Sequence, residues 1–305
     1  MALQSNLEQV LSTNTFVVTA EVGPPKGCNP EIIKKKAEML RESAHAFNVT
    51  DNQTAVVRLS SLAGSCILLD EGLEPILQMS CRDRNRIALQ SDVLGAAARG
   101  IKNILCITGD HQSMGNHPQA RGVFDVDSIQ LLQMIKTMRD DGLFQSGDEI
   151  KAGTPNVFLG AAANPFAGPF EYRVDRLEKK IDAGAAFIQT QSVYNIEKFT
   201  TWLDEVTSRG LDKKVHILAG ITPLKSLKMT ERMKSHVPGV DLPDDLYERM
   251  KQAKQPQAEG YQIALELIHE VKKLKSIHGI HLTALFWEEI IPSLVKEAQL
   301  MNQTP

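Results

Sequence analysis

Short apolar segments of β-forming residues alternate with longer amphipathic segments along the whole chain. The eight predicted strands are FVVTAEV (16–22), AFNVT (46–50), PILQMS (75–80), NILCITG (103–109), NVFLGAA (156–162), AFIQTQS (186–192), VHILAG (215–220) and IHLTAL (280–285). Most are apolar on both faces, as strands of a parallel sheet are when helices cover the sheet. This alternation predicts an α/β fold with parallel strands.

The segments between the strands have the apolar periodicity of helices that cover a sheet. Three of them carry apolar residues three and four positions apart, namely Leu131, Met134, Ile135 and Met138; Phe170, Val174, Leu177 and Ile181; and Phe199, Trp202, Leu203 and Val206. Asn195 and Asp125 precede two of these helices and are predicted as their N-caps.

Eight strands and about eight helices favour a (β/α)8 barrel, the TIM barrel, over an open doubly wound sheet. An open sheet that binds a dinucleotide usually carries G-x-G-x-x-G after its first strand, and this chain has no such motif. We therefore predict one barrel domain over residues 1–305, with an insertion at about 234–260 before the last helix–strand unit.

Charge and cysteine content limit the compartment and the partners. The chain has 34 Lys and Arg against 37 Asp and Glu, a net charge of −3, which gives no electrostatic basis for binding nucleic acid or an anionic membrane. The N-terminus does not resemble a signal peptide, and no apolar run is long enough to span a bilayer. Four scattered cysteines without C-x-x-C spacing predict reduced, mostly buried thiols. We expect a cytoplasmic protein.

Polar side chains gather where the predicted strands end, which is where barrels place their active sites. Glu21 ends the first strand, Asp110 follows the fourth and Gln191 lies in the sixth. Strand alternation puts Thr19 on the same face as Glu21 and Gln189 on the same face as Gln191. Two carboxylates and two amides are therefore predicted to share one mouth.

These residue types suit acid catalysis on a heterocycle. A carboxyl group in a partly apolar mouth has a raised pKa and can donate a proton. A second carboxylate stabilises positive charge, and a glutamine amide pairs with the amide edge of a ring. A structural alternative is open for each residue: Glu21 pairing with a loop lysine or arginine, Asp110 capping a loop, and Gln191 bonding to backbone. No metal-ligand spacing and no Ser–His–Asp arrangement is present.

Four segments together resemble the methylenetetrahydrofolate reductase family. They are AEVGPPKG (20–27), the NVT of the second strand, the ITGD of the fourth and DAGAAFIQTQ (182–191), and the resemblance runs from about residue 14 to 290. It implies a (β/α)8 barrel that binds FAD, or alternatively FMN, and reduces 5,10-methylenetetrahydrofolate to 5-methyltetrahydrofolate. The length resembles the short bacterial form.

The resemblance also implies roles for individual residues. Glu21 matches the general acid that protonates N10 of the folate before hydride arrives from N5 of the reduced flavin. Asp110 matches an aspartate beside flavin and pterin, and Gln191 matches the glutamine that holds the pterin. The implied flavin contacts are Thr50, Gln78, Thr108, Gly109, Asp110, Asn164, Arg176, Lys179 and Lys180.

Several positions depart from the family pattern, both at the flavin contacts and on the side that faces the electron donor. At the flavin contacts these are Gln78, Thr108, Asn164, Arg176 and Lys179. Met229, Met233, Thr283 and Trp287 replace residues that contact the nicotinamide and folate in relatives. The chain is similar here to reductase subunits of acetogens, which implies electrons from NAD(P)H or from a small zinc- and iron–sulfur-binding partner subunit, and a homo- or hetero-oligomer. The alternatives are another flavin barrel, a flavin-free folate barrel of the methyltransferase or pteroate synthase kind, and a non-catalytic scaffold subunit.

Overall fold

Eight parallel strands close into a barrel in the order β1 to β8, so the predicted (β/α)8 fold is confirmed. The computed structural model describes residues 5–301. The strands are β1 Val17–Val22, β2 Ala46–Val49, β3 Pro75–Ser80, β4 Asn103–Ile107, β5 Phe158–Ala163, β6 Phe187–Ser192, β7 His216–Ile221 and β8 Gly279–Leu282. All eight lie within the predicted segments or within a few residues of them.

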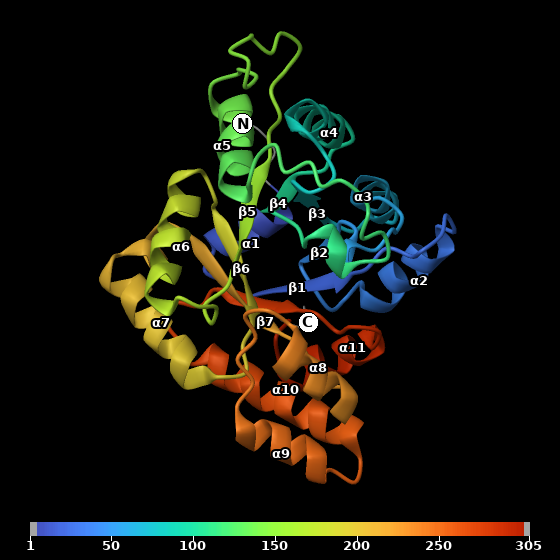
Figure 1. Ribbon diagram of the computed structural model, residues 1–305, viewed down its shortest axis with the longest axis vertical. Coiled ribbons are helices and arrows are strands. Elements are labelled where there is room, and N and C mark those ends of the chain that lie inside the picture. The colour runs from blue at the N-terminus through green and yellow to red at the C-terminus, as the bar shows by residue number, and fades with distance from the viewer. Residues whose placement is uncertain (1–4, 302–305) are drawn as a thin grey trace.

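Helices surround the barrel, as the ribbon in Figure 1 shows. They are α1 Asn6–Ser12, α2 Glu31–Leu40, α3 Ser61–Asp70, α4 Arg86–Ala98, α5 Ser128–Asp140, α6 Arg173–Asp182, α7 Ile196–Ser208, α8 Leu227–His236, α9 Asp244–Gln252, α10 Pro256–Lys272 and α11 Ile291–Glu297. Short 3-10 turns are η1 Gln53–Ala55, η2 Gln112–Met114, η3 Phe170–Tyr172, η4 Leu211–Lys213 and η5 Glu288–Ile290. The predicted insertion holds α9, which packs against α8 and α10. None of the described helices is long and apolar enough to cross a membrane.

One of the two predicted helix caps is confirmed and one is wrong. Asn195 caps α7 through its side chain. The cap of α5 is Asp127 instead of Asp125, because Asp127 stands three residues before Gln130 and the two form a reciprocal capping box. Asp125 instead accepts from the Arg86 guanidinium at 2.8 Å.

The lower part of the barrel interior is apolar and is closed by α1. Leu7 and Leu11 pack there against residues from seven strands, namely Val17, Ala46, Ile76, Leu105, Phe158, Phe187 and Leu218. The backbone N–H groups of Asn6 and Leu7 donate to the Glu74 carboxylate at 2.6 and 2.8 Å, which fixes this helix at the amino ends of the strands.

A polar layer lies above this apolar one. Asn48 and Gln189 exchange two hydrogen bonds, of 2.6 and 2.9 Å, across the barrel. Gln189 also donates to the Thr19 hydroxyl at 3.1 Å, and Thr19 contacts His281 Nδ1 at 2.9 Å. Burial lowers the His281 pKa to about 4, so this ring is neutral near pH 7. These side chains satisfy one another, which makes the layer a rigid floor beneath the mouth.

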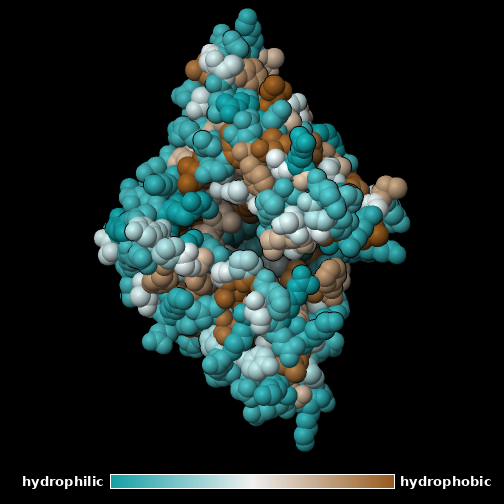
Figure 2. All heavy atoms as spheres, viewed as in Figure 1, coloured by the Kyte–Doolittle hydropathy of each residue, from teal (hydrophilic) through white to brown (hydrophobic). Residues whose placement is uncertain are grey.

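The face in Figure 2 is hollowed at its centre, where the strands of Figure 1 surround the barrel axis. Loops close in over it: Gly115 of the β4–α5 loop lies directly against Ala55 of the β2–α3 loop.

The four cysteines form no disulfide. All four are free; Cys81 and Cys106 are buried, whereas Cys28 is exposed and Cys66 is half-buried, so the prediction of mostly buried thiols is only half right.

Candidate functional site

The closed barrel brings the polar residues predicted from strand ends to one rim. They are Glu21 in β1, Thr50 after β2, Gln78 in β3, Thr108, Gly109 and Asp110 after β4, Asn164 after β5 and Gln191 in β6. All strands are parallel, so their carboxyl ends lie on the same side of the barrel. Their common position is thus a consequence of the fold, while their individual roles stay predictions.

Glu21 is half-buried, and its carboxyl is a weaker acid than an ordinary glutamate. Burial raises the pKa of its carboxyl to about 7, and the nearby negative charge of Glu288 adds to the increase. A hydrogen bond from Gln53 Nε2 at 3.3 Å and the charges of Lys36 and Arg58 act in the opposite direction. A carboxyl group that is part-protonated near neutrality is suited to donate a proton.

The neighbouring cations do not neutralise Glu21, contrary to the structural alternative. Lys36 pairs with Glu288 and also donates to the Gly23 carbonyl at 3.3 Å. Arg58 donates to the Pro24 carbonyl at 3.1 Å. Among the described residues no Lys or Arg forms an ion pair with Glu21, so its carboxyl stays available to a ligand.

Asp110 follows a turn that requires glycine. Gly109 has a φ of +90°, and a Cβ there would lie 3.1 Å from Ser80 Cβ and 3.2 Å from Arg82 Cβ. The Asp110 carbonyl accepts from Arg82 at 3.2 Å, whereas its carboxylate is exposed and accepts no hydrogen bond within residues 5–301. The carboxylate does not cap the loop. Thr108 donates to the Ser128 hydroxyl at 3.2 Å, at the start of α5.

Gln191 and Asn164 both hydrogen-bond to backbone groups. For Gln191 this is the structural alternative that the sequence left open. Gln191 Oε1 accepts from the Ser192 N–H at 3.0 Å, and its Nε2 donates to the Pro238 carbonyl at 3.4 Å. Asn164 Oδ1 accepts from two backbone N–H groups that follow it, and its amide fills the space where a Cβ on Gly239 would lie. The α8–α9 loop, through Pro238 and Gly239, therefore covers this side of the rim.

Of the three basic residues of α6 that were predicted as flavin contacts, one points toward the barrel and two point toward solvent. Lys180 Nζ donates to the Ala162 carbonyl at the end of β5, at 2.5 Å. Burial, with a smaller contribution from Arg176, lowers the Lys180 pKa to about 8. Arg176 and Lys179 lie on the exposed face of α6. Only Lys180 reaches the strand ends.

Two features of the rim fit a planar cofactor with a polar edge. The Thr50 hydroxyl is buried and has no hydrogen-bond partner among residues 5–301, although buried polar groups normally have one. Gly109 turns the chain after β4 with no side chain of its own, packed closely against Ser80 and Arg82. Thr50 lies two residues after Asn48, on the inner face of its strand, and therefore points toward the mouth.

A buried charged network at the ends of β2 and β3 was missed from the sequence. Asp51 accepts from the Ser80 N–H at 2.9 Å, from the Ser80 hydroxyl at 2.8 Å and from Arg84 at 2.7 and 3.2 Å. Arg82 pairs with Asp83 and donates to the Asn52 carbonyl at 3.3 Å. The signal was the run of charges in CRDRNR directly after the third strand. This network fixes the loops on which Asp110 and Gln53 stand.

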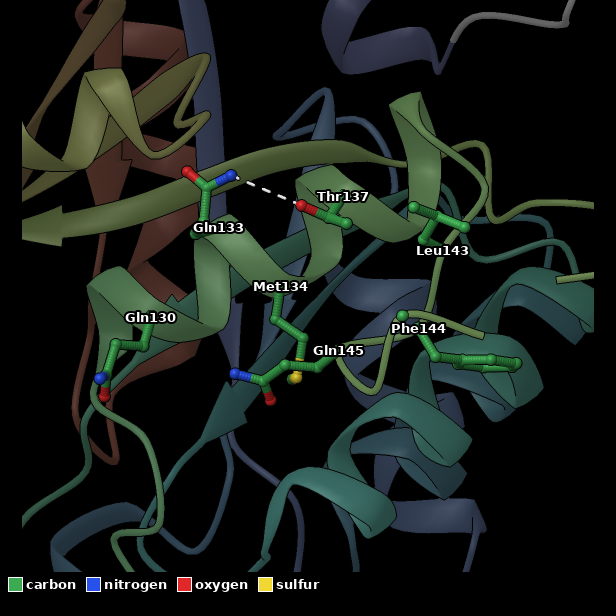
Figure 3. Close-up of a pocket in the computed structure, with 8 residues that line it drawn as sticks. Gln130, Gln133, Met134, Thr137, Leu143, Phe144 and Gln145 are labelled. Carbon is green, nitrogen blue, oxygen red and sulfur yellow. Dashed lines mark hydrogen bonds between the residues drawn. The ribbon is translucent and has the colours of Figure 1, made fainter. Parts of the chain in front are cut away.

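Two hollows elsewhere on the surface do not compete with the mouth. One, of about 400 Å³, lies between α5 and residues 143–147, where amide and apolar side chains line it (Figure 3). Its lining includes no titratable group. The other, of about 640 Å³, surrounds Asn6, His45 and Glu74 at the amino ends of the strands, where polar residues serve stability. The rim around Glu21 is the candidate active site.

Comparison with known sequences gives a consistent result. The family model described as methylenetetrahydrofolate reductase matches residues 6–299. A probable methylenetetrahydrofolate reductase (NADPH) of Caenorhabditis elegans is 23% identical over 98% of this chain and 44% of that protein. A 5,10-methylenetetrahydrofolate reductase of Pectobacterium carotovorum is 27% identical over 53% of this chain and 47% of that protein. The chain spans less than half the length of these curated relatives.

A solved structure has the same fold. An uncharacterized protein from Clostridium thermocellum, described as binding two copies of 5-methyl-5,6,7,8-tetrahydrofolic acid, superposes with a TM-score of 0.69 at 16% identity. The match covers 97% of this chain and 100% of that one. At this identity the likeness concerns the barrel itself.

Proposed function

The chain belongs to the methylenetetrahydrofolate reductase family, and we propose that it catalyses the flavin-dependent reduction of 5,10-methylenetetrahydrofolate to 5-methyltetrahydrofolate. The observation that carries the proposal is the Glu21 carboxyl, which stands at the barrel rim with a pKa of about 7 and forms no ion pair with any residue of the described chain. The folate bound by the Clostridium thermocellum protein is the product of this reaction, which supports the substrate class.

Glu21 is the proton donor in this mechanism. Its protonated carboxyl gives a proton to N10 of the folate, which opens the five-membered ring and leaves a cationic methylene carbon ready for hydride. Such proton transfer typically accelerates a reaction by about 10² to 10⁴. Half-burial keeps a fraction of Glu21 protonated near neutral pH, and the neighbouring amide of Gln53 stabilises the carboxylate that remains after proton transfer.

Asp110 and Gln191 orient and stabilise the pterin. The Asp110 carboxylate is free of internal hydrogen bonds in the described chain and can face the positive charge that develops on the ring. Gln191 presents one donor and one acceptor, the pattern that matches a pterin amide edge. To pair with the pterin, Gln191 exchanges its present bonds to the Ser192 N–H and the Pro238 carbonyl for bonds to the ring.

The flavin, when bound, supplies the hydride. Thr50, Gln78, Thr108, Gly109 and Asn164 would line its ring, and Lys180 would provide positive charge at the end of β5. Arg176 and Lys179 stand on the outer face of α6 and would reach only the distal part of the cofactor, such as a phosphate. The unpartnered Thr50 hydroxyl supports the fit, because it lacks the hydrogen bond that a ring heteroatom would offer.

Electrons reach the site from NAD(P)H or from a partner subunit, and the residues of the β7–β8 side favour the partner. Trp287 is 6% exposed, and Lys225 lies 5.9 Å from its ring centroid. Met233 is also buried. Two of the four side chains that stand where relatives contact the electron donor and folate are therefore packed inward, whereas Met229 and Thr283 are half-buried. Anaerobic mixing with NADH and, separately, with a low-potential one-electron donor tests this: fast stoichiometric bleaching by NADH alone would remove the need for a partner.

The cofactor released on denaturation tests the proposed function. We expect purified protein to be yellow and to release FAD, or FMN, in a 1:1 ratio, and to oxidise reduced flavin when methylenetetrahydrofolate is added. A colourless protein that binds folate would instead support the flavin-free folate barrel. Folate binding and flavin without turnover would support a scaffold subunit.

For Asp110→Asn we expect slower folate reduction and an altered reduction potential of the flavin. If both the rate and the potential were unchanged, Asp110 would have no part in the mechanism.

A further inference from the structure

The β2–α3 loop next to Glu21 has an unusual backbone. Asn52, Thr54 and Ala55 have φ values of 44°, 55° and 55°, in the left-handed region that favours glycine. The β-branched Thr54 is disfavoured there most strongly. Each such residue costs about 1–3 kcal/mol and persists only where the surrounding structure holds it. Three of them within four positions indicate that the loop is held in this conformation for a reason other than stability.

Contacts on both sides hold the loop. The Asn52 side chain accepts from the Arg58 N–H at 3.0 Å, and its carbonyl accepts from Arg82 at 3.3 Å. On the opposite side, Gly115 lies so close that a Cβ there would be 1.8 Å from the Ala55 carbonyl oxygen. The β4–α5 loop, which also carries Asp110, is therefore in direct backbone contact with this loop.

The loop presents one side chain to the carboxyl at the rim. Gln53 Nε2 donates to Glu21 Oε1 at 3.3 Å, and no other side chain of residues 5–301 donates a hydrogen bond to Glu21. The charged groups that face Glu21 are Lys36 on α2, Arg58 beyond the loop and Glu288 after β8. Lys36 and Glu288 pair with each other, so Gln53 is the contact that orients Glu21.

We propose that Gln53 is a positioning residue for Glu21, and that the strained loop exists to hold its amide against that carboxyl. The inference rests on the proposed function for its catalytic meaning. An amide N–H stabilises a carboxylate more than a carboxylic acid, so Gln53 fixes the orientation of the acid and also eases the loss of its proton. Gly115 couples this contact to the loop that bears Asp110.

The test measures the titration of Glu21 directly, without turnover. Difference infrared spectroscopy on protein with ¹³C-labelled glutamate follows the protonated carboxyl band that disappears in Glu21→Gln. Gln53→Met keeps the side-chain length and loses the donor, and Gln53→Ala serves as the second variant. We expect both to move the Glu21 titration to higher pH by about half a unit or more, since the lost bond favours the charged form.

A matched control and a coupling variant complete the experiment. Gln133→Ala removes a glutamine on α5 whose amide, within the described chain, hydrogen-bonds only to Thr137 at 3.5 Å, and it should leave the titration unchanged. Gly115→Ala must displace the Ala55 carbonyl, and we expect it to shift the titration as Gln53→Met does. A folate half-reaction with a displaced pH profile and lower rate in Gln53→Met would accompany these shifts.

The two proposals fail in different ways. If Gln53→Met and Gln53→Ala leave the infrared titration of Glu21 at its wild-type position, the positioning role is wrong, whatever the enzyme does to folate. If the titration moves but Glu21→Gln reduces folate normally, the proton-donor role of Glu21 is wrong and the positioning of the carboxyl stands. If the titration moves but the wild type with reduced flavin does not reduce folate, the proposed function is wrong and the positioning again stands. A titration that moves in Gln53→Met and is unmoved in Gly115→Ala would overturn the coupling between the two loops.

Discussion

Glu21→Gln should stabilise the folded protein above neutral pH while it removes the proton donor. The folded state raises the Glu21 pKa from 4.5 to about 7. Between these values the folded protein holds a proton that the unfolded chain has lost, so the stability that this carboxyl contributes falls as the pH rises. Below pH 4.5 both states are protonated and the carboxyl has no effect on stability. Above pH 7 both are charged, and the folded state bears the cost of a charge in a half-buried site.

The size of the effect follows from the shift. About 2.5 pKa units at 1.36 kcal/mol each give about 3.4 kcal/mol as an upper bound. Glu21 retains partial solvent exposure, which screens the charge, so we expect about 2 kcal/mol. Glutamine is neutral at every pH, and its carbonyl still accepts from Gln53. With an unfolding entropy of about 2.1 cal/mol/K per residue, 305 residues convert 2 kcal/mol into an increase in Tm of about 3 °C.

Urea unfolding of the wild type and Glu21→Gln at pH 4.5, 6 and 8 measures the difference. The two midpoints should coincide at pH 4.5 and separate progressively toward pH 8, with the variant more stable and the urea dependence unchanged. Equal midpoints at pH 8, or a variant that is less stable there, would refute the reasoning that Glu21 is held protonated by its surroundings. Gln53→Met at the same pH values separates a loss of the charge from a loss of the hydrogen bond.

Three further predictions concern the barrel and the groups around the rim. Ile217→Ala removes a fully buried side chain on the outer face of β7 and should lower the free energy of unfolding, measured in urea, by about 2–5 kcal/mol. Ile32→Ala, at a side chain that is 41% exposed, should lower it far less. Equal losses in the two variants would contradict this account of the packing. Asp51→Asn removes the buried carboxylate that pairs with Arg84 and leaves Asp92 as its remaining partner. It should lower the free energy of unfolding by about 2–4 kcal/mol in the same assay. A change near zero would argue against the network. Glu288→Gln removes a negative charge near Glu21 and frees Lys36 from its ion pair, so the Glu21 pKa should fall. The alkaline limb of the pH profile of the folate half-reaction should then move to lower pH. Movement to higher pH would contradict the role of Glu21 as the acid.

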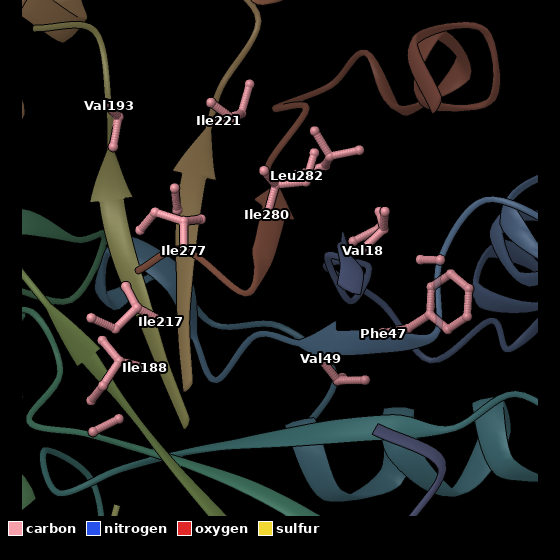
Figure 4. Packing of buried hydrophobic residues seen from close by; sticks show 14 of the residues in the cluster. Val18, Phe47, Val49, Ile188, Val193, Ile217, Ile221, Ile277, Ile280 and Leu282 are labelled. Carbon is pink, nitrogen blue, oxygen red and sulfur yellow. The ribbon is translucent and has the colours of Figure 1, made fainter. Parts of the chain in front are cut away.

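The strands were predictable because each is a short apolar segment that helices cover on its outer face. Figure 4 shows this face, where Val18, Val49, Ile188, Ile217 and Ile280 point away from the barrel axis into the layer beneath the helices. Alternation also predicted which polar residues face inward, since Thr19 and Gln189 meet in the barrel. The general position of the site then followed from the direction of parallel strands.

Loop conformation and side-chain contacts across loops were not predictable. Gln53 reaches Glu21 from a loop in which three neighbouring residues adopt left-handed backbone. Asparagine is common in that region, but Thr54 and Ala55 carry no sequence signal for it. The Asp51–Arg84 pair joins residues 33 positions apart whose proximity depends on the barrel closing. The wrong choice of Asp125 as a cap came from a competing Asp two residues later that also has its capping partner.

The central claim is that Glu21 supplies the proton for folate reduction, and a single-turnover experiment tests it most directly. Enzyme with its flavin reduced is mixed anaerobically with methylenetetrahydrofolate, and flavin oxidation is followed by absorbance in wild type and Glu21→Gln. We predict that the variant is slower by about 10²-fold or more, while reduction of its flavin by an artificial donor is unchanged. Oxidation of the variant at close to the wild-type rate would contradict the account.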